Sequence, residues 1–275
     1  MVNICNRFAK SRNLCFGTNP DPSKSKTKCI LFSTSKKDHL NLMPIMLNGN
    51  PLPWVTKVNH LGNVLQSDNS MEIDIRSKRG RFIGTVNSLL QELHFANPKM
   101  LTNLINTYAT SFYGSSLWDL YGKECDRLFK SWNVTIRQVF KLDRCTHKYL
   151  IEPASKVLHP KVMLASRLVT FHKSLLNSSK FEVRFLTRLV DHDQRTVLGR
   201  NLQRILEECD LKEKDISKLT CSLVKKKCRY HEIPAEESWR LDIVDELLSV
   251  RMENLCIEGF KENELEEMLR LICTT

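Results

Sequence analysis

Residues 60–93 read HLGNVLQSDNSMEIDIRSKRGRFIGTVNSLLQEL, and the spacing of apolar side chains changes within this stretch. Before it, short apolar runs are separated by turn-forming residues such as Asn48-Gly49, which is typical of strands and hairpins. After Asp68, apolar side chains recur about every three to four residues, the spacing of one helix face. They are Phe82, Ile83, Val86, Leu89, Leu90 and Leu93. The stretch therefore predicts a change from β-structure to helix near Asp68.

The first 66 residues are predicted to be rich in β-structure. The patterns predict a helix over residues 1–13, a loop rich in Pro and Gly, and a strand over residues 28–32. A hairpin is expected from residue 45 to residue 58, around Asn48-Gly49, and a further strand over residues 60–65. So few short strands do not close a core unaided, and they look like the edge of a larger sheet.

Everything after this region is predicted to be helical. Apolar residues at helical spacing indicate helices over residues 101–112, 128–140 and 164–175, and shorter ones over 181–190, 194–209 and 212–227. Two acidic helices are expected within residues 231–275. The fold class is thus α+β but mostly α, and we divide the chain into residues 1–66, 67–145, 146–230 and 231–275.

The charge is unevenly distributed along the 275 residues. The formal net charge is +11, which divides into +19 over residues 1–230 and −8 over residues 231–275. A basic body suits a polyanionic partner such as RNA or DNA, because each phosphate contact releases counterions. The acidic end does not suit such a partner, and is expected to pack on the body or to repel nucleic acid from one side.

Several classes of protein are disfavoured by the composition. No apolar run approaches the roughly 20 residues of a membrane span, and the N-terminal stretch lacks the apolar core of a secretory signal. We therefore expect an intracellular protein, nuclear or cytoplasmic, whose ten scattered cysteines are reduced. The best zinc-like run is Cys221, Cys228 and His231, but its spacing is wrong and a fourth ligand is missing. We expect no metal or cofactor.

The order of motifs along residues 14–140 resembles the C-terminal part of LINE-type, jockey-like non-LTR retrotransposon reverse transcriptases, which are RNA-directed DNA polymerases. In that family a loop with Asn-Pro leads to a Lys-x-Lys segment, a strand ending in an aromatic residue, a hairpin and an x-Leu-Gly turn. A helical thumb follows. The matching motifs here are Asn19-Pro20, Lys26-Thr27-Lys28, Cys29 to Phe32, His60-Leu61-Gly62, Arg81 to Gly84 and Ser111 to Gly114.

The resemblance implies a role for each segment. Residues 1–66 would be the remaining edge of a palm, residues 67–145 thumb-like helices, and residues 146–230 a basic helical region before the acidic tail. Lys26 would lie near the phosphates of an incoming nucleotide, and the His60-Leu61-Gly62 turn would help to seat the primer end. Together with Lys28, these residues are candidates for nucleic-acid contact.

The same resemblance implies that catalysis is absent. Polymerase chemistry needs paired carboxylates that hold two metal ions roughly 3.5–4 Å apart, and the family carries them upstream of the region that this chain matches. The parent enzyme would use Mg²⁺, but the nearest acidic pair here, Asp191 and Asp193, reads as a surface loop between helices. We therefore expect no catalytic residue and no polymerase activity.

Clusters of basic residues are the remaining candidates for contact with nucleic acid. Those before residue 82 are predicted to lie off the apolar face of their helix, and those between 127 and 141 to lie opposite Trp132. The densest cluster starts at Lys225 and would also serve as an import signal. The candidates are Arg76, Lys78, Arg79, Arg127, Lys130, Arg137, Lys141, Lys225, Lys226, Lys227 and Arg229.

Two hypotheses for the function follow. In the first, the chain is a transposable-element remnant that makes at most weak, sequence-independent contacts with RNA or DNA. In the second, it is a helical protein-interaction module whose basic surface is incidental and whose acidic tail binds a partner. The sequence does not decide between them, and it does not indicate an oligomeric state.

Overall fold

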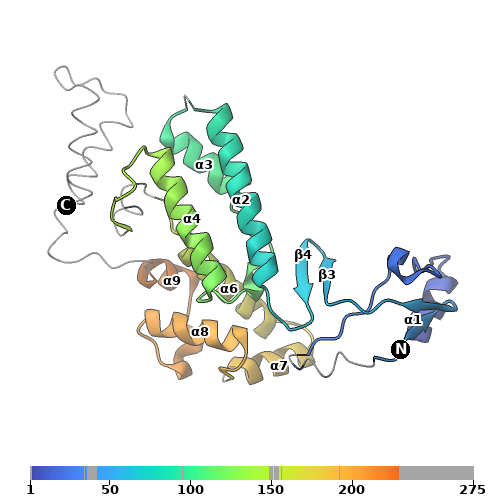
Figure 1. Ribbon diagram of the computed structural model, residues 1–275. Helices are drawn as coiled ribbons and strands as arrows, with labels where there is room; N and C mark the ends of the chain where they lie inside the picture. Colours follow the sequence, from blue (N-terminus) through green and yellow to red (C-terminus); the bar gives the residue numbers. More distant parts are fainter. Residues whose placement is uncertain are drawn as a thin grey trace, which may run out of the picture. The chain divides into compact units, whose positions relative to one another are not determined.

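The computed structural model describes residues 2–33, 35, 42–94, 96–148, 151, 155, 157–191 and 193–228. The chain divides into two compact units, Met1–Asp74 and Ile75–Thr275. All strands of the described residues fall in the first unit, and helices dominate the second, which confirms an α+β, mostly helical fold (Figure 1). The acidic helices predicted beyond residue 230, and Arg229, lie outside the described residues.

The first unit contains the hairpin predicted around Asn48-Gly49, but its second strand ends at Leu52, before Pro53, and not at residue 58 as predicted. Strands β1 (Ile45–Leu47) and β2 (Asn50–Leu52) pair in antiparallel register. The φ angles of Asn48 and Gly49 are 52° and 78°, the two left-handed residues that a type I′ turn requires. Leu47 and Leu52 are buried, as is Ala9 on helix α1 (Val2–Ser11), and these three residues form the small core of this unit.

A second hairpin replaces the single strand that was predicted over residues 60–65. Strands β3 (Lys57–His60) and β4 (Asn63–Gln66) pair in antiparallel register. The chain reverses at Leu61 and Gly62, whose φ angles are 47° and 79°. The strand prediction is wrong because Leu rarely adopts a positive φ, so Leu-Gly is a weaker turn signal than Asn-Gly. The resemblance, by contrast, placed a turn at these residues.

The strand predicted over residues 28–32 is also wrong. Only one isolated bridge forms there, between Cys29 and Trp54. The Cys29 N–H donates to the Pro53 carbonyl at 2.9 Å, and the Val55 N–H donates to the Cys29 carbonyl at 2.8 Å. Pro53 has no N–H to donate, which limits the ladder that can form beside it. The 3₁₀ turn η1 (Pro22–Lys24) precedes this segment.

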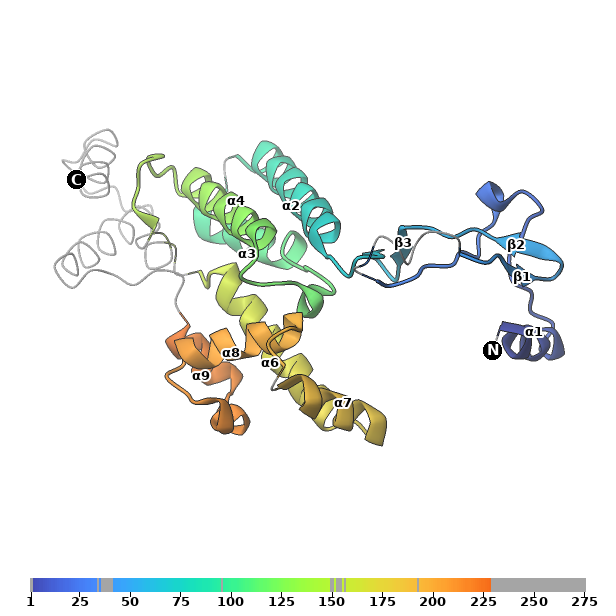
Figure 2. The same ribbon diagram turned by 60° about the horizontal axis from the view of Figure 1, so that its bottom comes forward.

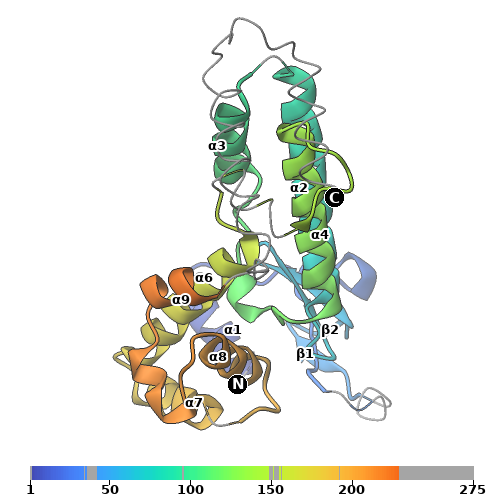
Figure 3. The ribbon, with the colours of Figure 1, turned by 90° about the vertical axis from the view of Figure 1, so that its left-hand side faces the viewer.

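Helices α2 (Glu72–Glu92), α3 (Pro98–Tyr108) and α4 (Lys123–Val139) run side by side (Figures 1 and 3). The Asn97 side chain caps α3 by accepting the Lys99 N–H at 2.8 Å, and proline occupies the first turn, where no N–H is needed. A 3₁₀ turn, η3 (Ser115–Leu117), leads from α3 toward α4. Their core combines buried aliphatic side chains such as Ile105 and Leu128 with a cluster of aromatic rings, which are those of Phe82, Phe112, Trp118 and Trp132.

The second half of this unit is built around helix α6 (Pro160–Leu176), which packs against α7 (Phe181–Asp191) and α9 (Cys221–Lys227) (Figure 2). Helix α8 (Val197–Glu208) packs on α7. The single helix predicted over residues 212–227 is wrong: the 3₁₀ helix η4 (Glu213–Lys218) ends before α9. Thr220 starts α9 anew, because its hydroxyl accepts the Leu223 N–H. No helix among the described residues is both long and apolar enough to span a membrane.

One buried amide joins the two halves of the second unit. The Asn201 side chain on α8 is fully buried, and its Nδ2 donates to the Trp118 carbonyl at 2.7 Å. Its Oδ1 accepts the Leu120 N–H at 3.1 Å. These hydrogen bonds satisfy backbone groups of the segment between η3 and α4, where no helix or strand provides partners. The Trp118 ring is itself completely buried.

We expect Asn201→Ala to lower the free energy of unfolding by about 2–4 kcal/mol, because it leaves a buried N–H and a buried carbonyl without partners. Chemical denaturation would measure this loss. The matched control is Asn87→Ala on the exposed side of α2, where the change should stay within about 0.5 kcal/mol. Equal effects of the two substitutions would contradict a structural role for Asn201.

Candidate nucleic-acid interface

Three cations form a stripe along the solvent side of α4. Lys123, Arg127 and Lys130 are exposed and recur at helical spacing, so they lie on one face. The buried residues of the same helix, among them Leu128 and Trp132, lie on the opposite face. Lys123 was not among the predicted residues, although its position four residues before Arg127 places it on the same face.

A buried carboxylate ties this stripe to α2. The Glu124 side chain is only 4% exposed, and its Oε1 accepts a hydrogen bond from the Arg76 guanidinium at 3.1 Å and a second from Arg127. Both guanidinium groups are more than half exposed. Burial alone would raise the pKa of Glu124, but the hydrogen bond from Arg76 and the charge of Arg127 outweigh it and leave the pKa below its ordinary value. The carboxylate is therefore ionised at neutral pH and fixes both arginines.

We call the resulting surface the α2–α4 basic face. Its cations are Arg76, Arg79, Lys123, Arg127 and Lys130. Two carboxylates oppose them, the buried Glu124 and Asp126, which pairs with Lys130 at 2.7 Å, so five positive charges against two leave +3. Arg79 and Lys123 have no ion-pair partner among the residues that the structure describes.

Lys78 does not belong to this face, and the prediction that it lies off the apolar side of its helix is wrong. It precedes Phe82 by four residues, so it shares the face of Phe82 and Val86, and it is only 7% exposed. Its ammonium group donates a hydrogen bond to the Tyr113 carbonyl and lies 5.5 Å from the centre of the Trp118 ring. Lys78 is thus a core residue whose charge is satisfied internally.

Arg137 is also turned toward the protein, unlike the cations earlier on α4. Its Nη2 donates to the Thr146 carbonyl at 2.7 Å, and burial lowers the pKa of its guanidinium. It therefore anchors the segment after α4. Lys141 lies beyond the helix end, exposed, with a φ of 51°.

The lysine cluster on α9 is partly free. Lys225 and Lys226 are exposed, whereas Lys227 pairs with Asp210 at 2.8 Å. The hydrogen bond that Lys227 donates to the Asp210 carboxylate raises the pKa of Lys227, so the pair stays charged. This helix packs on α6 and lies on a different element from the α2–α4 basic face.

The residues that the resemblance singled out lie in the first unit and are all exposed. Lys26 and Lys28 both precede the bridge residue Cys29, and the Lys26 N–H donates to the Gly17 carbonyl at 3.0 Å. His60, Leu61 and Gly62 form the tip of the β3–β4 hairpin, where Leu61 is 74% exposed. They are not the only exposed cations of the first unit, because Arg7 and Lys10 on α1, and Arg12 just after it, are exposed as well.

The acidic pair Asp191 and Asp193 does not form a metal site. Asp191 ends α7 and is buried against His172, with Oδ1 at 2.5 Å from Nε2, so the prediction of a surface loop is wrong for it. Asp193 instead pairs with Arg195 at 2.9 Å. Each carboxylate thus has its own protein partner, and these residues do not fit a Mg²⁺ pair. No group of three metal-ligating side chains occurs among the described residues.

The two described cysteines of the zinc-like run, Cys221 and Cys228, also have separate partners. The Cys221 thiol lies 3.1 Å from the Thr170 hydroxyl, whereas the Cys228 thiol lies 3.6 Å from that of Cys209. Burial raises the pKa of Cys228, which favours the protonated thiol over the thiolate that zinc binds. His231 lies outside the described residues.

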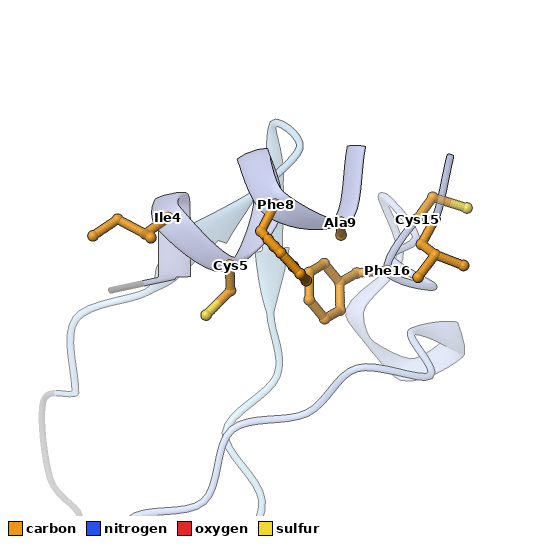
Figure 4. Close-up of a pocket in the computed structure, with 7 residues that line it drawn as sticks. Ile4, Cys5, Phe8, Ala9, Cys15 and Phe16 are labelled. Carbon is orange, nitrogen blue, oxygen red and sulfur yellow. The ribbon is translucent and has the colours of Figure 1, made fainter. Parts of the chain in front are cut away.

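An apolar groove occurs beside α1 in the first unit (Figure 4). Its volume is about 610 Å³, and its lining is Ile4, Cys5, Phe8, Ala9, Leu14, Cys15 and Phe16. Such a lining offers no acid, base or phosphate-binding group apart from two thiols, so the groove is not built for polymerase chemistry.

No protein-family model, curated protein or solved structure matches the chain.

The buried Glu124 carboxylate and the two arginines that it holds, Arg76 and Arg127, form what we call the Glu124 clamp. This clamp makes the free energy of unfolding depend on pH. Because the pKa of Glu124 is lower in the folded chain than in the unfolded one, its contribution is complete above the unfolded pKa and is lost as the pH falls through the folded pKa. We expect Glu124→Gln to lower the free energy of unfolding at neutral pH, and this difference to shrink as the pH approaches about 3.

The matched control is Asp126→Asn, two residues away, which removes a half-exposed surface pair and should change stability by less than about 1 kcal/mol. Denaturation curves over a pH series would measure both variants. A loss in Glu124→Gln that does not vary with pH would contradict the clamp.

Proposed function

We propose that the chain represents the C-terminal part of a LINE-type reverse transcriptase, and that its described helices contribute nucleic-acid contact without polymerase chemistry. The α2–α4 basic face carries this proposal. It lies within residues 67–145, the part of the chain whose sequence resembles the thumb of these reverse transcriptases. In polymerases of this kind such helices would track the backbone of the primer–template duplex.

The geometry of the face suits a phosphate backbone. Arg76 and Arg127 converge on one carboxylate oxygen, so their guanidinium groups are held close together while more than half exposed. Arginine forks bind phosphate with paired N–H donors, and a fixed fork loses less entropy on binding. Gly80 and Gly84 are exposed on α2 as well, and a side chain at either position would meet open space. The phosphate backbone of a nucleic acid can therefore approach α2 closely.

The charge of the face predicts a weak and salt-sensitive interaction. With +3 over five cations, about three phosphates are engaged, and log affinity should fall with log salt with a slope of about −3 on duplex. Dissociation constants of order 10⁻⁴–10⁻⁶ M at physiological salt are typical of such contacts. No base-reading element is needed, so we propose binding that is independent of sequence.

Absence of catalysis forms part of the proposal. Asp191 and Asp193 in the described C-terminal half already pair with His172 and Arg195. The family resemblance covers a region downstream of the metal-binding aspartates. Contact with RNA or DNA, rather than synthesis, is thus the activity we assign.

The alternative is a protein-interaction module. One observation favours it: helix α7 exposes Phe181, Phe185, Leu186 and Leu189, each by at least half of its surface. Such an apolar face is typical of a protein contact rather than of a phosphate contact. The two roles use different elements, α7 and α2–α4, and can be separated by substitution.

The proposed function is tested by a salt titration of binding to a fluorescent RNA–DNA duplex. The intact chain is compared with Arg79→Ala/Lys123→Ala, which removes the half-buried Arg79 and the exposed Lys123, neither of which pairs with a carboxylate among the described residues. We expect the slope of log affinity against log salt to weaken by about two units, with unchanged thermal stability.

The matched control, Lys99→Ala/Lys212→Ala, removes the same charge from exposed positions outside the face. Its slope should stay within about half a unit of that of the intact chain. Equal loss in both variants would mean that charge alone, and not this face, binds the duplex. No binding at low salt would favour the interaction module.

A further inference from the structure

Helix α7 turns its most apolar side to solvent. Phe181, Phe185 and Leu189 recur at intervals of four residues, so they lie in one row along the helix, and Leu186 borders that row. The four side chains are 66%, 50%, 55% and 59% exposed, in that order. The Phe181 and Phe185 rings stack on each other with centroids 6.0 Å apart, which leaves a continuous aromatic surface.

The inner side of the same helix combines the half-buried Val183 and Val190 with polar groups that already have partners. Thr187 is buried, and its hydroxyl donates to the Val183 carbonyl at 2.7 Å. Asp191 is buried against His172 of α6. Two helices therefore hold α7 by its polar side, α6 through this pair and α8 through packing contacts (Figure 2). Rotating the helix to bury its apolar row would break the Asp191–His172 pair, so the row stays available for a partner.

The charges beside this row indicate what kind of partner it accepts. The exposed Lys180 and Arg188 flank it, with the half-buried Arg184, whose Nη1 donates to the Ser178 carbonyl, farther round the helix, against the single exposed acid Glu182. A second copy of α7 would bring these cations against each other, which disfavours a symmetric dimer. An acidic helix with its own apolar row would instead match both the charge and the hydrophobicity of the surface.

The chain itself contains such a segment. Residues 261–272 read KENELEEMLRLI, with four glutamates and two basic residues. Leu265, Met268, Leu269 and Ile272 recur at the spacing of one helix face. The segment thus pairs an apolar row with an acidic surround, the complement of the surface on α7.

The segment can reach this surface from where the described chain ends. Both α9, which ends the described residues, and α7 pack on α6, whose 17 residues measure about 25 Å. The 32 residues between Cys228 and Lys261 can span about 100 Å when extended. The connection therefore places no limit on an intramolecular contact.

We propose that the apolar row of α7, with its flanking cations, is the docking surface for the acidic segment 261–272 of the same chain. The contact is independent of the nucleic-acid role, because it uses none of the five cations of the α2–α4 basic face. It assigns the strongly acidic end of the chain a fixed position on the basic body.

The test is limited proteolysis of the full-length chain with a glutamate-specific protease, without nucleic acid. Cleavage between Glu262 and Glu267 is followed by mass spectrometry. When cleavage needs an undocked segment, its rate follows the undocked population, so Phe185→Gln/Leu189→Gln should speed it by about tenfold or more. Both residues are at least half exposed, so the substitutions leave the folded core intact.

The matched control is Ile4→Gln/Phe8→Gln, which makes the same chemical change at exposed apolar residues of the α1 groove. Its cleavage rate should equal that of the unmodified chain. Rapid cleavage in the unmodified chain, or no acceleration in the α7 variant, would overturn the proposal. So would acceleration by the α1 variant, or a dimer that the α7 variant dissociates without changing cleavage.

Discussion

The contact between Trp118 and Asn201 is the interaction on which the second unit depends. The buried indole sits among Phe112 and the Lys78 ammonium group, while its carbonyl is held by the Asn201 amide on α8. Helices α2, α4 and α8 are thereby fixed through one short non-helical segment. A buried polar link of this kind is costly to break and tolerates few alternatives, and it acts together with the contacts of α6 with η3 and α4 where the two halves of the unit meet.

That packing positions the proposed interface. With α2 and α4 held side by side, Arg76 and Arg127 reach the same carboxylate of Glu124, which is buried where the two helices begin. The buried carboxylate lowers the net charge of the α2–α4 basic face by one. It also holds two guanidinium groups together that would otherwise repel each other. The proposed function therefore depends on how the buried Glu124 positions the surface arginines, and not on the number of basic residues alone.

The sequence predicted the helices well, because a period near 3.6 residues is a property of the chain itself. It failed where tertiary partners decide the outcome. The burial of Lys78 depends on a carbonyl 35 residues away, and the role of Glu124 depends on Arg76, 48 residues away. The apolar pattern predicted a strand through Leu61-Gly62, where only the resemblance placed a turn, because Leu61 has an unusual positive φ. It also predicted a strand beside Pro53, where the absent N–H donor limits the ladder. The α2–α4 basic face was thus only partly predictable, and Lys123 required the observed helix.

The central claim, that α2 and α4 contact nucleic acid, is tested most directly by amide hydrogen exchange with and without an RNA–DNA duplex at low salt. The account predicts slower exchange in peptides covering residues 76–87 and 123–134 when duplex is present, and no change in peptides covering α7. Protection confined to residues 221–228, or no protection anywhere despite measured binding, would contradict it.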